Sequence, residues 1–124
     1  MSSNLYLVFS EPPADVPAEK YERWYHHHAE ENLRSPGMIA SQRYRVTPII
    51  AGRRTAPATF SGGTGELSPQ HLALYEYSGA IEPLREHLLA RVDSGDVVLP
   101  EWFDRISFMT WNCEPIGVRF TASD

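Results

Sequence analysis

The chain of 124 residues has a single cysteine, Cys113, so it cannot form an intramolecular disulfide bond. It also has no apolar run near the roughly 18 residues of a membrane-spanning helix, and no charged-then-apolar leader opens it. Basic residues are outnumbered, 11 against 16 acidic residues, which gives a formal net charge of -5. Nucleic-acid binding usually selects a basic surface, so this balance argues weakly against such a partner. We expect a soluble, cytoplasmic protein with neither a nucleic-acid nor a membrane partner.

Motifs of metal binding and nucleophilic catalysis are also missing. His26, His27 and His28 are consecutive, so on a helix they point about 100° apart and cannot share one ion well. The sequence holds no His-Glu-x-x-His motif, no Gly-x-Ser-x-Gly elbow, and no Gly-Lys-Ser/Thr after the glycines at 62–65. A buried free cysteine is usually inert, and Cys113 falls in a predicted strand. We therefore predict neither a metal site nor a cofactor.

The hydrophobic pattern predicts one domain, residues 1–124, without repeats or a composition break. Alternating residues predict strands at 4–10, 38–46, 71–77 and 106–113, and helical spacing predicts helices from 17 to about 34 and at 80–92. The order β-α-β-β-α-β is that of the ferredoxin-like α+β fold, a four-stranded antiparallel sheet with helices on one face. Residues 49–70, rich in glycine and proline, are predicted to form a long loop or lid.

Three of the predicted strands are apolar on both faces. In the first strand, Leu5, Leu7 and Phe9 alternate with Tyr6 and Val8. Helices cover one face only, and soluble monomers rarely leave a large apolar patch in water. We therefore predict a homodimer that pairs sheet to sheet. The alternative is that the loop at 49–70 folds over the sheet.

The first predicted helix carries an unusual stripe on the side that faces the sheet. At about 100° per residue this side holds aromatic and polar residues instead of aliphatic ones, and it excludes His26 and His27. Its members are Tyr21, Trp24, Tyr25, His28 and Asn32. Glu31 and Asn32 follow His28 at three and four positions, where either could fix the tautomer that a general base requires. The alternative is a buried neutral histidine with a structural role.

The chain resembles the dimeric α+β barrel superfamily, and most closely its EthD-like and related small members. The residues that carry this resemblance lie at 5–9, 24–25, 28, 36–37, 43–44, 72–76 and 115–117. The resemblance implies two ferredoxin-like sheets packed face to face, with a pocket in each subunit that a histidine at position 28 often lines. The superfamily includes isomerases, cyclases, dehydratases, monooxygenases and haem proteins, so the fold leaves the reaction open.

These residues together suggest proton transfer without a cofactor. We predict His28 as general base and Tyr75 as general acid or oxyanion partner, in a pocket between the first helix, the sheet and the 49–70 loop. The predicted substrate-binding residues are Tyr6, Trp24, Tyr25, Asn32, Arg43, Tyr77 and Trp111. An aromatic core is the alternative for the tyrosines and tryptophans, and solvated charge is the alternative for Arg43.

The expected activity is that of an isomerase, cyclase or lyase. Its substrate would be a small molecule with a carbonyl group, aromatic or polyketide-like in shape, as in the breakdown of aromatic compounds. One alternative is a non-catalytic ligand-binding or stress-responsive protein. Another is a monooxygenase that acts on an aromatic substrate or on haem.

Overall fold

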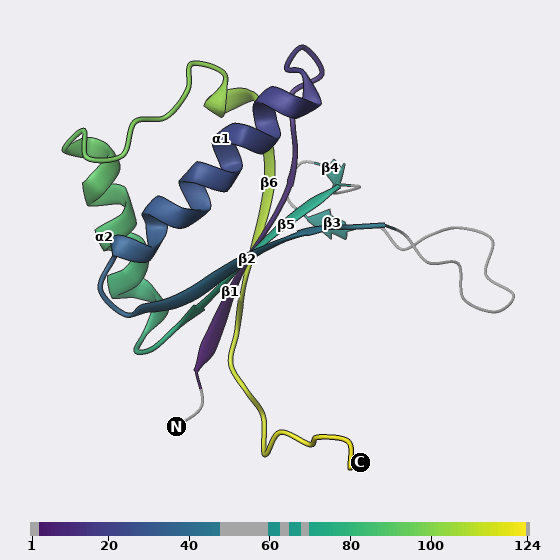
Figure 1. Ribbon diagram of the computed structural model, residues 1–124, viewed down its shortest axis with the longest axis vertical. Coiled ribbons are helices and arrows are strands. Elements are labelled where there is room, and N and C mark those ends of the chain that lie inside the picture. The colour runs from purple at the N-terminus through teal and green to yellow at the C-terminus, as the bar shows by residue number, and fades with distance from the viewer. Residues whose placement is uncertain (1–2, 48–59, 63–64, 68–69, 124) are drawn as a thin grey trace, which may run out of the picture.

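The computed structural model describes residues 3–47, 60–62, 65–67 and 70–123. Its main feature is a four-stranded antiparallel sheet in the order β2-β5-β1-β6, with α1 and α2 together on one face (Figure 1). The strands are β1 (Asn4–Glu11), β2 (Met38–Arg45), β5 (His71–Tyr77) and β6 (Ser107–Cys113), and the helices are α1 (Ala18–Glu31) and α2 (Ile81–Asp93). This arrangement confirms the predicted ferredoxin-like α+β fold.

Short elements complete the described chain. The 3-10 helix η1 (Asn32–Arg34) extends α1, and η2 (Phe103–Arg105) precedes β6. The strands β3 (Phe60–Gly62) and β4 (Gly65–Leu67) pair antiparallel as a separate hairpin. This hairpin lies within the segment at 49–70, which was predicted to form a long loop or lid. The remainder of the predicted lid lies outside the described residues.

Proline begins α1, and glycine makes the turn that follows η1. The Pro17 carbonyl accepts the first helical hydrogen bond, from the Tyr21 amide at 3.1 Å. Between η1 and β2, Gly37 has φ +91°, a conformation that strongly favours glycine. A Cβ at Gly37 would lie 2.9 Å from the Ser78 carbonyl oxygen, and the Ser78 amide donates to the Gly37 carbonyl at 2.8 Å. The glycine thus lets the chain reverse into β2 close against the end of β5.

The strand register decides which side chains face the helices. Tyr6 on β1 pairs with Tyr75 on β5 and with Asn112 on β6. Directly paired residues share a face, so these three side chains lie on the helix side. Val8 is buried on that side as well, and the Ser10 hydroxyl lies 2.6 Å from the Tyr21 hydroxyl of α1. The helix side of the sheet is therefore lined by aromatic and hydroxyl groups.

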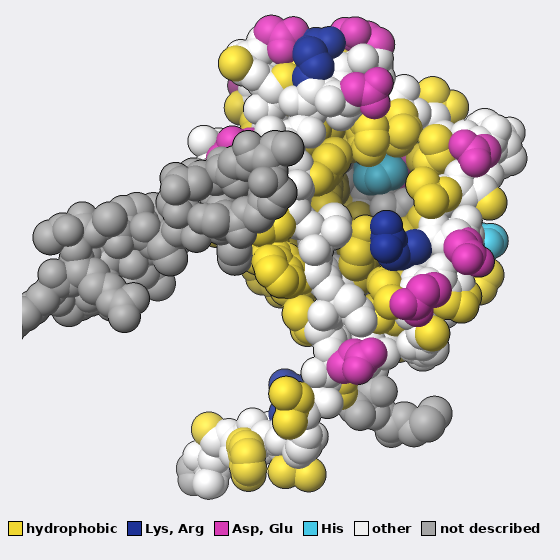
Figure 2. Space-filling view, turned by 180° about the vertical axis from the view of Figure 1, so that it is seen from behind, with side chains coloured by type: hydrophobic (Ala, Val, Ile, Leu, Met, Phe, Trp, Pro, Cys, Tyr) yellow, Lys and Arg dark blue, Asp and Glu magenta, His cyan; other side chains and the backbone are white. Residues whose placement is uncertain are grey.

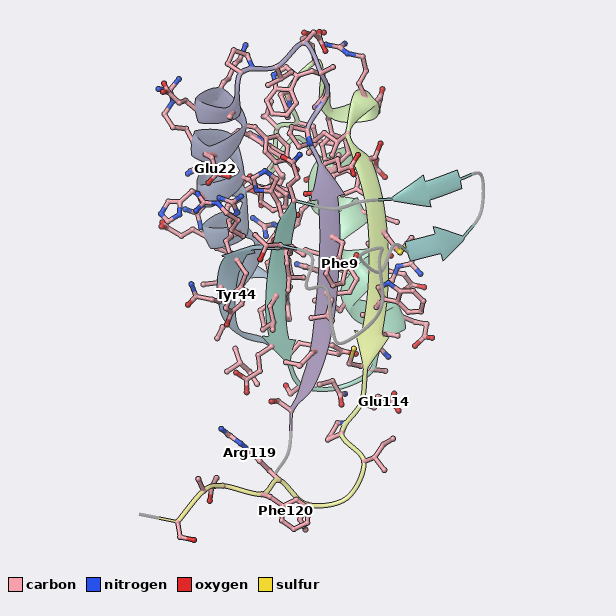
Figure 3. The ribbon with its side chains drawn as sticks, turned by 90° about the vertical axis from the view of Figure 1, so that its right-hand side faces the viewer. Phe9, Glu22, Tyr44, Glu114, Arg119 and Phe120 are labelled. Carbon is pink, nitrogen blue, oxygen red and sulfur yellow. The ribbon has the colours of Figure 1, made fainter. Side chains whose placement is uncertain are left out.

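The opposite side, which we call the open face, is apolar. Leu7 pairs with Leu74 on β5 and with Trp111 on β6, so all three point away from α1 and α2. Tyr44 and Trp111 are each 49% exposed there. Figure 3 looks onto this face, with Phe9 and Tyr44 labelled. Its main residues are Leu5, Leu7, Phe9, Tyr44, Leu72, Leu74, Met109 and Trp111.

A β-bulge breaks the simple alternation of faces at the start of β2, where Met38 and Ala40 would otherwise share one face. The pairing shifts between these residues, with Met38 opposite Tyr77 and Ala40 opposite Glu76. The extra residue reverses the alternation, and Met38 packs against the buried core on the helix side.

Candidate functional site

A cavity of about 300 Å³ lies between the helices and the helix side of the sheet. Figure 2 shows a hollow with a histidine in it, bordered mainly by hydrophobic side chains and on one side by a basic side chain. Its described lining residues are Tyr6, Val8, Tyr25, His28, Asn32, Tyr75, Leu88, Leu89, Val92, Leu99, Phe103, Phe108 and Thr110. None of these carries an acidic or permanently charged basic group. The volume and the mainly apolar lining are typical of small-molecule sites.

The helical period of α1 separates its three histidines as predicted. The side chain of His28 is 15% exposed and lines the cavity, whereas that of His27 is 70% exposed. His26 is also exposed, and Tyr25 and Asn32 are buried on the same side as His28. The aromatic stripe of α1 therefore forms one wall of the cavity.

A chain of hydrogen bonds joins α1 to the sheet through His28. The Glu31 carboxylate lies 3.2 Å from His28 Nδ1, so the neutral imidazole donates its Nδ1–H to the carboxylate. The Asn32 Nδ2 amide donates to His28 Nε2 at 3.3 Å and to the Tyr75 hydroxyl at 3.1 Å. In this arrangement the lone pair of the imidazole is on Nε2. The order of the groups is thus Glu31, His28, Asn32, Tyr75.

Burial keeps His28 neutral. Loss of solvent lowers the pKa of His28 below 6.5, and the hydrogen bond and charge of Glu31 only partly oppose this effect. The positive charge of Arg91 lowers this pKa further. At neutral pH the imidazole is therefore unprotonated at one nitrogen, the form that a general base needs.

The tyrosines of the cavity are held in the protonated form. Burial raises the pKa of Tyr75 to about 12, although the Asn32 amide opposes this rise. Burial also raises the pKa of Tyr6, and it raises that of Tyr25 well above 10. The rings of Tyr6 and Tyr75 are 6.0 Å apart. Because Tyr75 accepts a hydrogen bond from Asn32, its own O–H remains a donor for a ligand atom.

The buried guanidinium of Arg91 on α2 braces the end of α1. Its Nη1 donates to the Glu31 carbonyl at 2.9 Å and to the Ser35 hydroxyl at 3.0 Å, and its Nε donates to Asp96 at 2.8 Å. A cation is stabilising at a helix C-terminus, where carbonyl groups lack helical partners. Arg91 thereby fixes the backbone that carries Glu31 and Asn32 beside His28.

The structure brings five of the predicted site residues together around the cavity. They are Tyr6, Tyr25, His28, Asn32 and Tyr75. Trp24 supports the site from behind, because its ring stacks on His28 with centroids 4.9 Å apart and an interplanar angle of 16°. Trp24 itself does not line the cavity.

Three predicted substrate-binding residues lie elsewhere, so their placement in the pocket is corrected. Arg43 makes a two-pronged ion pair with Glu22 at 3.1 and 3.2 Å and lies over the outer side of the Tyr25 ring. Tyr77 is fully buried at the far end of β5, where its hydroxyl donates to Asn112. Trp111 points from β6 to the open face.

The sequence did not predict the second wall of the cavity. α2 and the following segment supply Leu88, Leu89, Val92, Leu99 and Phe103. Leu88 and Val92 lie four positions apart on α2, on an apolar stripe typical of an ordinary buried helix side. Nothing in the sequence indicates that Arg91, a charged residue beside that stripe, is buried. The predicted wall at 49–70 contributes no described residue to the lining.

In the described part of the chain, no three His, Cys, Asp or Glu side chains are grouped as a metal site would require. Neither helix in that part is both long and apolar enough to cross a membrane.

Comparison of the chain with protein-family models, with curated proteins and with solved structures finds no match. The assignment of function therefore depends on the cavity and its hydrogen bonds.

Proposed function

We propose that this protein is a cofactor-independent isomerase, cyclase or lyase that moves a proton on a small carbonyl compound. The observation that carries this proposal is the hydrogen-bonded series Glu31, His28, Asn32 and Tyr75, which ends in an apolar cavity. A neutral imidazole held in one tautomer beside a protonated phenol supplies the two groups that enolisation needs.

In the proposed reaction, His28 Nε2 takes a proton from the carbon next to the substrate carbonyl. The 3.3 Å contact from Asn32 to Nε2 is long, so a bound substrate can displace it at small cost. Negative charge then develops on the carbonyl oxygen, where the Tyr75 hydroxyl and the freed Asn32 amide can donate. Glu31 stabilises the imidazolium that forms.

The cavity lining also suggests the kind of substrate. Polar groups come from α1, β1, β5 and β6, whereas α2 and the segment at 99–103 contribute only apolar side chains. No lining residue in the described part of the chain is a cation, although the charge of Arg85 acts on Tyr6 from outside the lining. Burial of an unpaired charge inside the cavity is costly. We therefore propose an uncharged substrate with its carbonyl toward His28 and an aromatic or polyketide-like body toward α2.

The test is deuterium exchange at the carbon next to a carbonyl, followed by NMR over a panel of neutral aromatic ketones and diketones. We expect His28→Gln to lower turnover roughly 10²–10⁴-fold, the usual scale for a positioned acid-base group. Tyr75→Phe should lower turnover by about 10²–10³-fold as a lost oxyanion donor. His27→Gln is the matched control and should be unchanged. Undiminished exchange in His28→Gln would exclude His28 as the base.

A second candidate is a ligand-binding protein without catalysis. It is favoured by the Asn32 amide, which already occupies the His28 lone pair and the Tyr75 oxygen. Calorimetry with the same compounds distinguishes the two candidates: tight binding without any deuterium exchange would favour this second function.

We also propose that two copies pair through their open faces, as the resemblance to dimeric α+β barrels implies. The support is the apolar character of this face, with Tyr44 and Trp111 half-exposed on it. Apart from β3 and β4, the alternative cover, the loop at 49–70, lies outside the described residues. Light scattering at micromolar concentration should give about twice the 14.0 kDa of one chain. A stable monomer would contradict the pairing.

A further inference from the structure

The segment that follows β6, residues 114–123, is described as an extended tail that leaves the body of the protein (Figures 1 and 3). Three large apolar side chains alternate along it. Ile116 is 99% exposed, Val118 is 74% exposed and Phe120 is 90% exposed. Figure 2 shows hydrophobic side chains gathered on this tail away from the main body. Single exposed apolar residues are common, but an alternating row of three on an extended segment is typical of an interaction site.

The tail continues directly from the open face. Met109 and Trp111 on β6 point to that face, and β6 is an edge strand of the sheet. Pro115 and Gly117 then redirect the chain, the glycine with φ +71°. The apolar alternation resumes within this turn, at Ile116, and continues at Val118 and Phe120. One chain therefore carries two apolar surfaces that adjoin at the end of β6.

We infer that the tail of one copy packs against the rim of the open face of a second copy. This inference rests on the proposed sheet-to-sheet pairing. In such a pair the end of β6 lies at the border of the interface, so the tail emerges beside the partner's sheet. A twofold axis makes the contact reciprocal, and each dimer then buries two tails. The surface that the tail contacts is thus the partner's open face, the same apolar face that the sheet-to-sheet pairing covers.

The test is the dissociation constant of the dimer, measured by sedimentation on the full-length chain. The variant Val118→Ser/Phe120→Ser changes side chains that are mostly exposed, so each subunit should fold normally. Removing one large apolar side chain from a buried contact weakens an association constant about tenfold or more. We expect the dissociation constant to rise at least about tenfold. Arg119→Gln, on the same tail, is the matched control and should not change it.

The outcomes separate this inference from the pairing itself. If the parent is a dimer and the double variant dimerises equally well, the tail contact is wrong and the sheet pairing stands. If the parent is a monomer, both are wrong.

A photo-crosslinking amino acid in place of Phe120 gives a second readout. It should join two chains, with the attachment mapped to an edge of the partner's open face, on a peptide that contains Tyr44 of β2 or Met109 of β6. Crosslinks confined to the same chain would overturn the inference.

Discussion

Replacement of His28 by alanine should destabilise the protein, because its ring is both a cavity wall and a structural link. The substitution removes the hydrogen bond to Glu31, and the side chains of His28 and Glu31 are only 15% and 10% exposed. A hydrogen bond to a charged group is worth about 1.5–3 kcal/mol. Loss of the stacking on Trp24 adds roughly 0.5–1.5 kcal/mol. Water entering the cavity will solvate part of the orphaned carboxylate, so we expect a net loss of about 2–3 kcal/mol.

Thermal unfolding followed by circular dichroism measures this loss. For a chain of this length 1 kcal/mol corresponds to roughly 3–5 °C in Tm, so the Tm of His28→Ala should fall by about 10 °C. His27→Ala is the control, since His27 is 70% exposed and lies 3.7 Å from Glu31. Its Tm should change by no more than a degree or two. Equal Tm values for His28→Ala and the parent would refute the hydrogen-bonded series of Glu31, His28, Asn32 and Tyr75.

Two further predictions concern pH and the brace at the end of α1. Burial lowers the pKa of both His28 and His71, so the unfolded chain binds more protons than the folded chain as the pH falls below 6.5. The free energy of unfolding should therefore be highest above pH 6.5 and decrease below it. Urea denaturation at several pH values measures this dependence. An increase in the free energy of unfolding as the pH falls below 6.5 would contradict it. Arg91→Met should lower the free energy of unfolding in urea by about 2–4 kcal/mol, because two buried acceptors lose their hydrogen-bond donor. Asp96→Asn should lower it by well under 1 kcal/mol, because the Asp96 side chain is 59% exposed. If the two variants lose the same free energy of unfolding, the contacts of Arg91 with the Glu31 carbonyl and the Ser35 hydroxyl contribute nothing to stability.

The local part of the site could be predicted from the sequence. Tyr25, His28 and Asn32 share one side of α1 because the helical period alone sets their directions. The links from His28 to Glu31 and Asn32 follow from the same period, since both partners lie within one turn. The order of strands and helices likewise specified the ferredoxin-like fold, which the structure confirms.

The remaining features depend on long-range packing. Alternation along a strand defines two faces but does not say which one meets the helices, so Trp111 was placed in the pocket although it points to the open face. Tyr77 shares a face with Tyr75 but lies beyond the cavity, at the strand's end. The position of Phe103 depends on the path of the chain after α2, for which no local pattern exists. A bulge such as that at Met38 leaves no local sign in one sequence.

The proposed role of His28 as base is tested most directly by the protonation state of its ring in the free protein. Nitrogen-15 NMR of histidine-labelled protein at pH 7, with the His28 signals assigned from His28→Gln, reports both ring nitrogens. The hydrogen bonds to Glu31 and Asn32 predict a neutral ring protonated at Nδ1, with a lone pair on Nε2. A ring protonated at Nε2, or a charged imidazolium at this pH, would contradict the proposed base.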